Sequence, residues 1–380
     1  IYRDRGEVMN GLVTIKKKRK GRGDLPLLFS VIIISLLGLA FVYSASKYSA
    51  EVTYGDEFFF AKKHLVGLFI GYAAMIFGCA FDYEKYKKIS LPSFIVTLVL
   101  LVLVFSPLGY ENYGAKRWIR IGGITVQPSE IAKICFVLFS AAYFSDEPRR
   151  AKSFIGCLPV LCAGGTVCLL IILEPNMSIT VCFGLLTLAV LFAAGMKTAH
   201  FVIILVPAAL AVPLLIIAEP YRLNRLSAFL NPWASPKGEG YQLLQSLYAL
   251  GSGGWFGVGY LNSRQKLRFL PFSESDFILA VIGEETGFVG LAVFFALILF
   301  VIIRGIKIAV KAKDHFGYLT AVGITCIYAV QSLVNALVVT GSIPPTGLPL
   351  PLVSAGNTSL IVFLFSFGVL YNVSRRSPSD

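Results

Sequence analysis

The residues best suited to chemistry lie in one stretch in the second half of the chain. A carboxylate, Asp276, opens a long apolar run, and a glycine-rich segment with the cations Arg264 and Lys266 precedes it. Glu284 and Glu285 follow inside the apolar run. Ionisable residues at membrane depth are costly and usually have a function. Asp276 could act as a general base and the cations could stabilise an anionic ligand, although a carboxylate at a helix start can also simply cap the helix.

The composition predicts a helical membrane protein. The chain has 380 residues, of which 56% are hydrophobic and 14% are charged. Soluble domains are about 45–50% apolar and about 25% charged. The net charge of +13 does not indicate nucleic-acid binding, because the cations lie in short segments between apolar runs. Seven cysteines without metal-ligand spacing and three histidines predict no Cys/His metal centre.

Apolar runs of helical length predict an all-α polytopic fold with about ten transmembrane helices. This transmembrane domain would span residues 25–374, between a basic tail at 1–24 and a short tail at 375–380. The expected spans lie near 25–43, 58–80, 89–108, 128–145, 153–173, 178–195, 199–218, 276–303, 317–340 and 356–374.

The distribution of cations predicts the orientation. Most of the 34 Lys and Arg residues fall in the tails and in alternate loops, on the side that the positive-inside rule makes cytoplasmic. Both termini are therefore expected in the cytoplasm. The extracytoplasmic loops would be 109–127, 219–275 and 341–355, and the largest of them lies between spans seven and eight.

Cations on the outer side, where the rule disfavours them, suggest an anionic ligand. The first outer loop carries Lys116 and Arg117 beside Trp118, and Lys62 and Lys63 open the second span from the same side. One of these two lysines could snorkel toward water while the other faces the protein interior. Attraction to anionic lipid headgroups is the alternative explanation for the outer cations.

Buried charges need partners, and the sequence offers candidates. Glu130 and Lys133 are spaced i, i+3 and share a helix face, so they form either a structural ion pair or part of a substrate channel. A cation from such a neighbouring span could balance Glu284 and Glu285. On one continuous helix, Glu284 would lie about 80° around and about 12 Å deeper than Asp276.

The segment 341–359 contains four prolines and no charge, so it cannot form a regular helix. A re-entrant loop or the wall of a groove for a lipid tail would suit it.

The order of motifs along the chain resembles the SEDS family (shape, elongation, division and sporulation), and it is nearest to the FtsW/SpoVE branch. The resemblance covers nearly everything from the first span to the last. Its motifs are Gly114-Ala-Lys-Arg-Trp-Ile119, Gln127-Pro-Ser-Glu130 with Lys133, Glu174-Pro175, Asn231-Pro232, Gly240-Tyr-Gln242, Gln245-Ser246, Gly253-Gly254, Gly257-Val-Gly259, Gln265-Lys266, Leu270-Pro271, Ser275-Asp-Phe277, Gly283-Glu-Glu285 and Gly347-Leu-Pro-Leu-Pro351.

The resemblance implies a peptidoglycan glycosyltransferase of the bacterial cytoplasmic membrane. Such an enzyme polymerises lipid II at the outer face, for division, sporulation or elongation. Its implied partners are a class B penicillin-binding protein and other division or elongation proteins. The essential aspartate of the family falls on Asp276, its loop tryptophan on Trp118 and the adjacent arginine on Arg117. A divalent cation, Mg²⁺ or Mn²⁺, is also implied, with ligands that spacing does not assign.

Two other functions remain open on the sequence. A lipid II flippase would use the same outer cations, but it would need a polar path across the bilayer. An inactive scaffold for the penicillin-binding protein would leave Asp276 replaceable. In the polymerase, Asp276 would deprotonate the acceptor sugar, while Lys116, Arg117 and the cations of 264–268 would stabilise the pyrophosphate leaving group.

Overall fold

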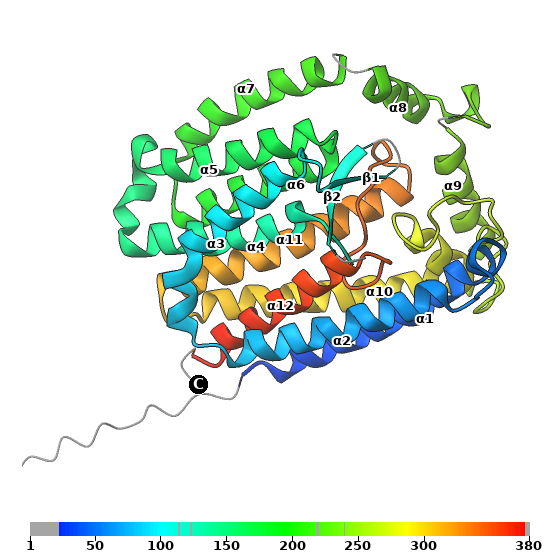
Figure 1. The fold of residues 1–380 in the computed structure, drawn as a ribbon, viewed down its shortest axis with the longest axis horizontal. Coiled ribbons are helices and arrows are strands. Elements are labelled where there is room, and N and C mark those ends of the chain that lie inside the picture. Colours follow the sequence, from blue (N-terminus) through cyan, green and yellow to red (C-terminus); the bar gives the residue numbers. More distant parts are fainter. Residues whose placement is uncertain (1–22, 113–114, 122–123, 218–219, 239, 377–380) are drawn as a thin grey trace, which may run out of the picture.

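A computed structural model describes residues 23–112, 115–121, 124–217, 220–238 and 240–376. The predicted tails, 1–24 and 375–380, thus lie almost entirely outside the described residues. Long helices laid side by side make up most of the molecule (Figure 1). They are α1 (Leu25–Tyr54), α2 (Phe59–Ala80), α3 (Tyr83–Leu103), α4 (Pro128–Asp146), α5 (Phe154–Leu173), α6 (Met177–Ala194), α7 (Thr198–Ile217), α10 (Ile278–Val310), α11 (His315–Val339) and α12 (Asn357–Ser374).

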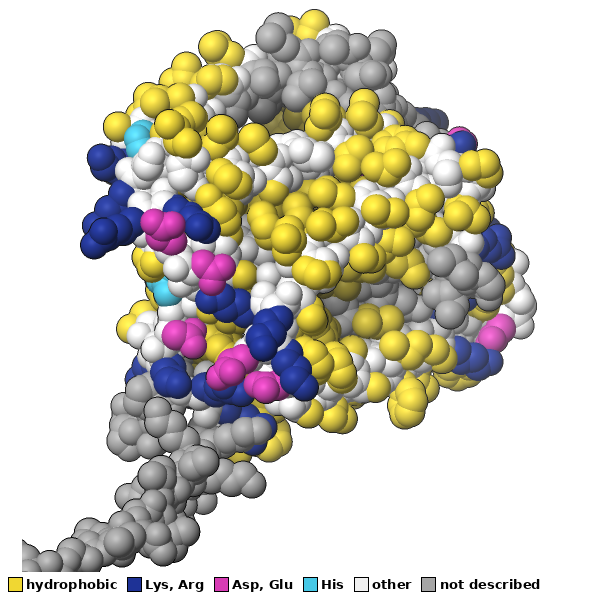
Figure 2. Space-filling view, turned by 60° about the vertical axis from the view of Figure 1, so that its left-hand side comes forward, with side chains coloured by type: hydrophobic (Ala, Val, Ile, Leu, Met, Phe, Trp, Pro, Cys, Tyr) yellow, Lys and Arg dark blue, Asp and Glu magenta, His cyan; other side chains and the backbone are white. Residues whose placement is uncertain are grey.

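Within the described residues, eight of these helices are long and apolar enough to cross a membrane. They confirm the predicted multi-pass helical fold. The other two long helices are α4, which carries two buried charges, and α7, which lies at the edge of the bundle (Figure 1). Hydrophobic side chains spread over the flank of the molecule, whereas charged ones gather at its left side and, in a smaller group, along its right edge (Figure 2). The flank is thus suited to lipid and the two charged sides to water.

The chain enters and leaves the bundle at the same end. Asp24 caps α1, accepting a hydrogen bond from Leu27 N at 3.0 Å, and pairs with Arg304 at 2.6 Å. The Asp24 amide donates to Ser374 Oγ at 2.9 Å, which joins the start of α1 to the end of α12. The two ends of the described chain therefore lie on the same side of the bundle, which agrees with an even number of membrane crossings.

Small residues let the central helices approach closely. A Cβ atom at Gly368 of α12 would lie 2.3 Å from Met75 O of α2, and one at Gly78 would lie 2.9 Å from Phe365 O. These two helices can therefore pack backbone to backbone, as small residues permit in membranes. Helix α11 packs against α4, α6 and α10, and so occupies the middle of the bundle (Figure 1).

The predicted loop 109–127 is a small antiparallel sheet, which adds strands to a fold predicted to contain only helices. It has the order β1 (Gly109–Asn112), β2 (Ala115–Ile121) and β3 (Ile124–Val126). Tyr110 pairs with Trp118 and Arg120 with Thr125. We call the end of the bundle that carries this sheet the sheet end.

The segment between α7 and α10, predicted as one long loop, is partly helical. It contains α8 (Pro220–Leu230), the 3₁₀ turn η2 (Pro232–Ala234) and α9 (Tyr241–Gly253). Irregular backbone continues from Gly254 to Phe277. The stretch between Ser342 and Gly356 contains no helix or strand, as its prolines predict.

Candidate functional site

Asp276 lies just before the helix it was predicted to open. Helix α10 begins at Ile278, with Phe277 as its N-cap residue and no capping hydrogen bond from a side chain. The alternative that Asp276 merely caps the helix is therefore wrong. The depth and angle expected between Asp276 and Glu284 do not apply either, because they assumed one continuous helix through both. The Asp276 side chain is half-buried at the sheet end.

The proline-rich segment folds over Asp276 and fixes its backbone. Asn335 of α11 donates from Nδ2 to Asp276 O at 2.9 Å and to Leu348 O at 2.8 Å. Ser354 Oγ donates to Ser275 O at 2.6 Å. A methyl group at Gly347 would lie only 3.3 Å from Asp276 Oδ2. The absence of a side chain at Gly347 thus leaves space directly beside the carboxylate.

Two arginines act on Asp276 from different parts of the chain. Burial raises the pKa of Asp276 to about 6, while Arg225 and Arg117 act to lower this pKa and Glu274 acts to raise it. Arg225 lies on α8, where its Nη1 donates to Pro345 O at 3.1 Å. A carboxylate with a pKa near neutral, on which two guanidinium groups act electrostatically, combines a general base with cations that could bind an anion.

Arg225 was not among the predicted site residues. It was one cation among several in the loop 219–275, and no local spacing distinguished it from the others.

The two neighbouring cations of β2 differ in exposure. Arg117 and Trp118 are half-buried, whereas Lys116 is exposed. The register between β1 and β2 shifts at Arg117, because Tyr110 pairs with Trp118 and Glu111 with Lys116. Arg117 acts electrostatically on Asp276, and the exposed Lys116 remains a candidate for ligand binding.

Arg117 also joins the sheet to the turn after α5. Its Nε donates to Glu174 O at 3.2 Å, and its Nη2 donates to Pro175 O. The Glu174 side chain is only 1% exposed. Glu174 was recognised as part of a motif, but its neighbours in the chain offered no reason to assign it a role.

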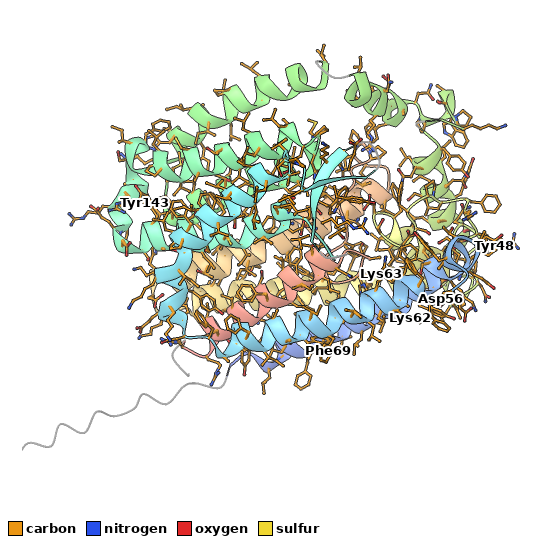
Figure 3. The ribbon with its side chains drawn as sticks, viewed as in Figure 1. Tyr48, Asp56, Lys62, Lys63, Phe69 and Tyr143 are labelled. Atoms are coloured by element: carbon orange, nitrogen blue, oxygen red, sulfur yellow. The ribbon has the colours of Figure 1, made fainter. Side chains whose placement is uncertain are left out.

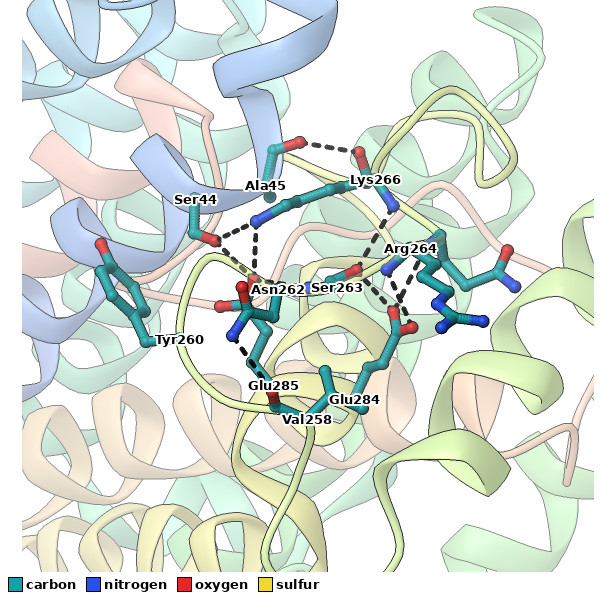
Figure 4. Close-up of polar contacts among 12 residues, drawn as sticks. Ser44, Ala45, Val258, Tyr260, Asn262, Ser263, Arg264, Lys266, Glu284 and Glu285 are labelled. Atoms are coloured by element: carbon teal, nitrogen blue, oxygen red, sulfur yellow. Dashed lines mark hydrogen bonds and ion pairs between the residues drawn. The ribbon is translucent and has the colours of Figure 1, made fainter.

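The cation that pairs with Glu285 of α10 comes from the preceding loop and not from a neighbouring span (Figure 4). Lys266 Nζ pairs with Glu285 Oε1 at 2.9 Å and donates to Ser44 Oγ at 3.0 Å. Ser44 Oγ in turn donates to Glu285 Oε1 at 2.6 Å. Lys266, predicted to bind pyrophosphate, is buried in this ion pair, so it anchors the loop to α1 and α10.

Glu284 holds the backbone of the same loop. Ser263 Oγ donates to Glu284 Oε2 at 2.5 Å, and the Arg264 amide donates to Glu284 Oε1 at 3.0 Å (Figure 4). The amide of Gln265 adds a third hydrogen bond at 3.3 Å. The Arg264 side chain itself is exposed and remains a candidate for ligand binding.

The glycines of the loop permit close backbone contact with α10. Gly287 has φ 68° and ψ −169°, which interrupts α10 just after the two glutamates. Val258 N donates to Glu284 O at 2.9 Å, and Phe288 N donates to Gly254 O at 2.9 Å. A Cβ atom at Gly257 would lie 2.1 Å from Glu285 O. The glycine-rich stretch therefore has a packing role at this position.

Glu130 and Lys133 form the structural ion pair that was one of their two predicted roles. Lys133 Nζ lies 2.8 Å from Glu130 Oε1 and 2.7 Å from Gln331 Oε1, and both charged side chains are buried. A cavity beside Lys133 has a volume of about 10 Å³, which is at most enough for one water molecule. The pair thus lies in a closely packed part of the bundle.

Lys62 and Lys63 are both exposed. Lys62 pairs with Asp56 at 2.8 Å, and Lys63 Nζ lies 4.1 Å from the centre of the Phe59 ring. The prediction that one of them faces inward is wrong, because both are on the exposed side of α2. Phe69, two turns further along α2, also projects outward (Figure 3).

The described residues contain no group of three or more His, Cys, Asp or Glu side chains that could hold a metal ion.

Known proteins resemble this chain in sequence and in fold. The family described as cell cycle proteins, which comprises FtsW, RodA and SpoVE, matches residues 25–379. Stage V sporulation protein E of Bacillus subtilis is 39% identical over 94% of this chain and 99% of its own length. A probable peptidoglycan glycosyltransferase FtsW of Geobacter sp. is 38% identical over 93% of this chain and 97% of its own.

Two solved structures share the architecture. One is a chain from the work "Structural coordination of polymerization and crosslinking by a peptidoglycan synthase complex", with a TM-score of 0.77 and 28% identity over 93% of this chain and 98% of that chain. The other is the rod shape determining protein RodA of Thermus thermophilus, with a TM-score of 0.70 and 25% identity over 94% and 98%. The chain therefore belongs to the FtsW/RodA/SpoVE family of SEDS proteins.

Proposed function

We propose that this protein is a peptidoglycan glycosyltransferase that polymerises lipid II into glycan strands at the outer face of the bacterial cytoplasmic membrane. FtsW relatives that cover nearly the whole chain bear the name peptidoglycan glycosyltransferase. The observation that carries the proposal is the half-buried Asp276 carboxylate, with a pKa of about 6 and with Arg117 and Arg225 acting on it.

Asp276 is the general base of the proposed reaction. It accepts the proton of the acceptor GlcNAc 4-hydroxyl, and the resulting oxygen nucleophile attacks the anomeric carbon of the donor. The bond from that carbon to the lipid pyrophosphate breaks, and the pyrophosphate leaves with the electron pair. A carboxylate suits this proton transfer when it lies within hydrogen-bond reach of the hydroxyl group and its pKa is near the working pH. A single displacement inverts the anomeric configuration.

The arginines act on the leaving group. Negative charge grows on the pyrophosphate as the glycosidic bond breaks, and fixed cations in a partly water-excluded site stabilise it. Arg117 and Arg225 are both held by backbone carbonyl groups, at 174–175 and at 345. Such anchoring positions the guanidinium groups before the substrate arrives, so little reorganisation is needed during the reaction.

We further propose a class B penicillin-binding protein as the partner that crosslinks the new strands. The similar chain with the TM-score of 0.77 comes from a complex described as coordinating polymerization and crosslinking. The sequence identities to SpoVE and FtsW favour the division or sporulation branch of the family.

We also propose that the activity depends on Mg²⁺ or Mn²⁺.

The test is synthesis of glycan strands from purified lipid II. The purified protein with its penicillin-binding partner and Mg²⁺ or Mn²⁺ should form polymer, and Asp276→Asn should lose it. Asp146→Asn is the matched control, because Asp146 is an exposed residue paired with Lys87 at the end of α4 away from the sheet. Full polymerisation by Asp276→Asn would overturn the assignment of the base. Absence of polymer from the wild type, with lipid II crossing liposome membranes instead, would favour the flippase.

A further inference from the structure

Glu174 is a buried carboxyl group without a hydrogen-bond partner. It follows the last residue of α5 and is 1% exposed. Neither Oε1 nor Oε2 accepts or donates a hydrogen bond among the residues that the structure describes. An ionised carboxylate in such surroundings is strongly disfavoured, since it loses water without gaining a donor. Buried polar groups are usually hydrogen-bonded, so a buried carboxyl group without a partner suggests a functional role.

The charge that acts on this carboxyl group is that of Arg117, which is also part of the proposed active site. The guanidinium binds the backbone carbonyls of Glu174 and Pro175, and not the Glu174 carboxyl group. Arg117 acts to lower the pKa of both Glu174 and Asp276. One guanidinium group is thus electrostatically linked to a buried carboxyl on one side and to the proposed base on the other.

Other charged groups around α5 are paired or lie away from Glu174. The 3₁₀ turn η1 (Pro148–Lys152) carries Arg149, Arg150 and Lys152, but it precedes the start of α5, whereas Glu174 follows its end. Helix α6 carries no charged residue. On α4, Glu130 and Lys133 neutralise each other at 2.8 Å. The charged residues of α3 (Glu84, Lys85, Lys87 and Lys88) lie in its first two turns, whereas α3 leads into the sheet at its other end.

We propose that Glu174 is a positioning residue that controls how Arg117 meets the pyrophosphate of the substrate. When Glu174 is neutral, the charge of Arg117 acts on Asp276 and on the bound pyrophosphate. When Glu174 loses its proton to water, its carboxylate attracts the adjacent guanidinium and withdraws that charge from the substrate. This inference rests on the proposed glycosyltransferase function and deepens it.

The protonation state fits this role. Burial raises the pKa of Glu174 to about 8, with Arg117 acting in the opposite direction. The neutral form therefore dominates at neutral pH, and the ionised form appears as the pH rises through about 8. Substrate affinity should fall over the same range, because the ionised form competes with pyrophosphate for the same cation.

The experiment compares the pH dependence of KM and kcat for lipid II in the wild type and in Glu174→Gln, with the penicillin-binding partner present. In the wild type, KM should rise up to about tenfold per pH unit above the pKa of Glu174, with a smaller change in kcat. Glu174→Gln keeps a neutral side chain of the same shape, so its KM should not show this rise. Glu147→Gln, an exposed residue paired with Arg150 away from the sheet, should keep the wild-type profile.

Persistence of the wild-type alkaline rise in Glu174→Gln would overturn the inference, as would loss of polymerisation by this folded variant at neutral pH. Infrared difference spectroscopy of the wild type adds a test that needs no substrate. A protonated carboxylic-acid band should disappear as the pH passes the pKa of Glu174, and its absence would also overturn the inference. If the wild type forms no polymer at any pH, the proposed function fails, whereas the infrared result still decides the protonation of Glu174.

Discussion

The buried pair of Lys266 and Glu285 offers the sharpest test of how the loop before α10 is held. Their side chains are 5% and 0% exposed, and the charged atoms lie 2.9 Å apart. Ser44, 241 residues away from Glu285 in the sequence, completes the network. We consider three variants: Lys266→Met, Glu285→Gln and the two together.

The expected magnitude follows from what each variant leaves behind. Lys266→Met leaves the Glu285 carboxylate buried with donors from Ser44 and Ser263 but no cation. Breaking a buried pair by removing one partner costs about 3–5 kcal/mol of unfolding free energy. The double variant removes both charges, so it should be more stable than Lys266→Met, with a coupling energy of about 0.5–3 kcal/mol between the two sites.

The assay is reversible denaturation of the purified protein in detergent micelles, with glycan synthesis measured in parallel. Lys62→Met serves as the control, since its partner Asp56 is 37% exposed and Lys62 itself is 66% exposed. An exposed pair of this kind contributes about 0–1 kcal/mol. Wild-type stability of Lys266→Met, or strictly additive effects of the two substitutions, would refute the reasoning.

Three further expectations concern the site and its support. Polymerisation should fall as the pH drops through about 6, because Asp276 must be ionised to accept a proton, and a pH–rate profile that stays flat there would contradict its assignment as the base. Gly287→Ala should lower the free energy of unfolding by more than about 1 kcal/mol, because the residue has φ 68° and a Cβ atom would lie 2.3 Å from Gly257 N. The melting temperature of the variant, compared with that of the wild type, measures this loss of stability. Chelation of divalent cations should stop glycan synthesis and added Mg²⁺ or Mn²⁺ should restore it, whereas undiminished synthesis in excess chelator would exclude the metal.

Several features could be predicted from the sequence because they depend on local properties. Apolar runs of about twenty residues require helices in a bilayer, since the backbone must satisfy its own hydrogen bonds there. The structure has long helices close to each expected run, although α1 extends to Tyr54, beyond the predicted end at 43. Prolines at 344, 345, 349 and 351 similarly exclude a helix, and none forms between 342 and 356.

The sequence also identified Asp276 and Arg117, through the order of motifs along the chain. It could not show which cations are already paired within the protein. Lys266 and Arg264 are neighbours in one basic stretch, but the first is buried against Glu285 and the second is exposed. This difference depends on which side chains a long loop buries when it packs against α1 and α10.

The membrane class, the helical runs, the family and the residue most suited to be the base could all be inferred from the order of amino acids alone. The three-dimensional arrangement was needed to show that Arg225 and Arg117 act on Asp276, that Lys266 holds the loop in place, and that Glu174 is buried beside Arg117. Hydropathy and periodicity can be inferred from the sequence because they depend on a few neighbouring residues. Burial and charge pairing, in contrast, join residues such as Ser44 and Glu285 that are far apart in the chain.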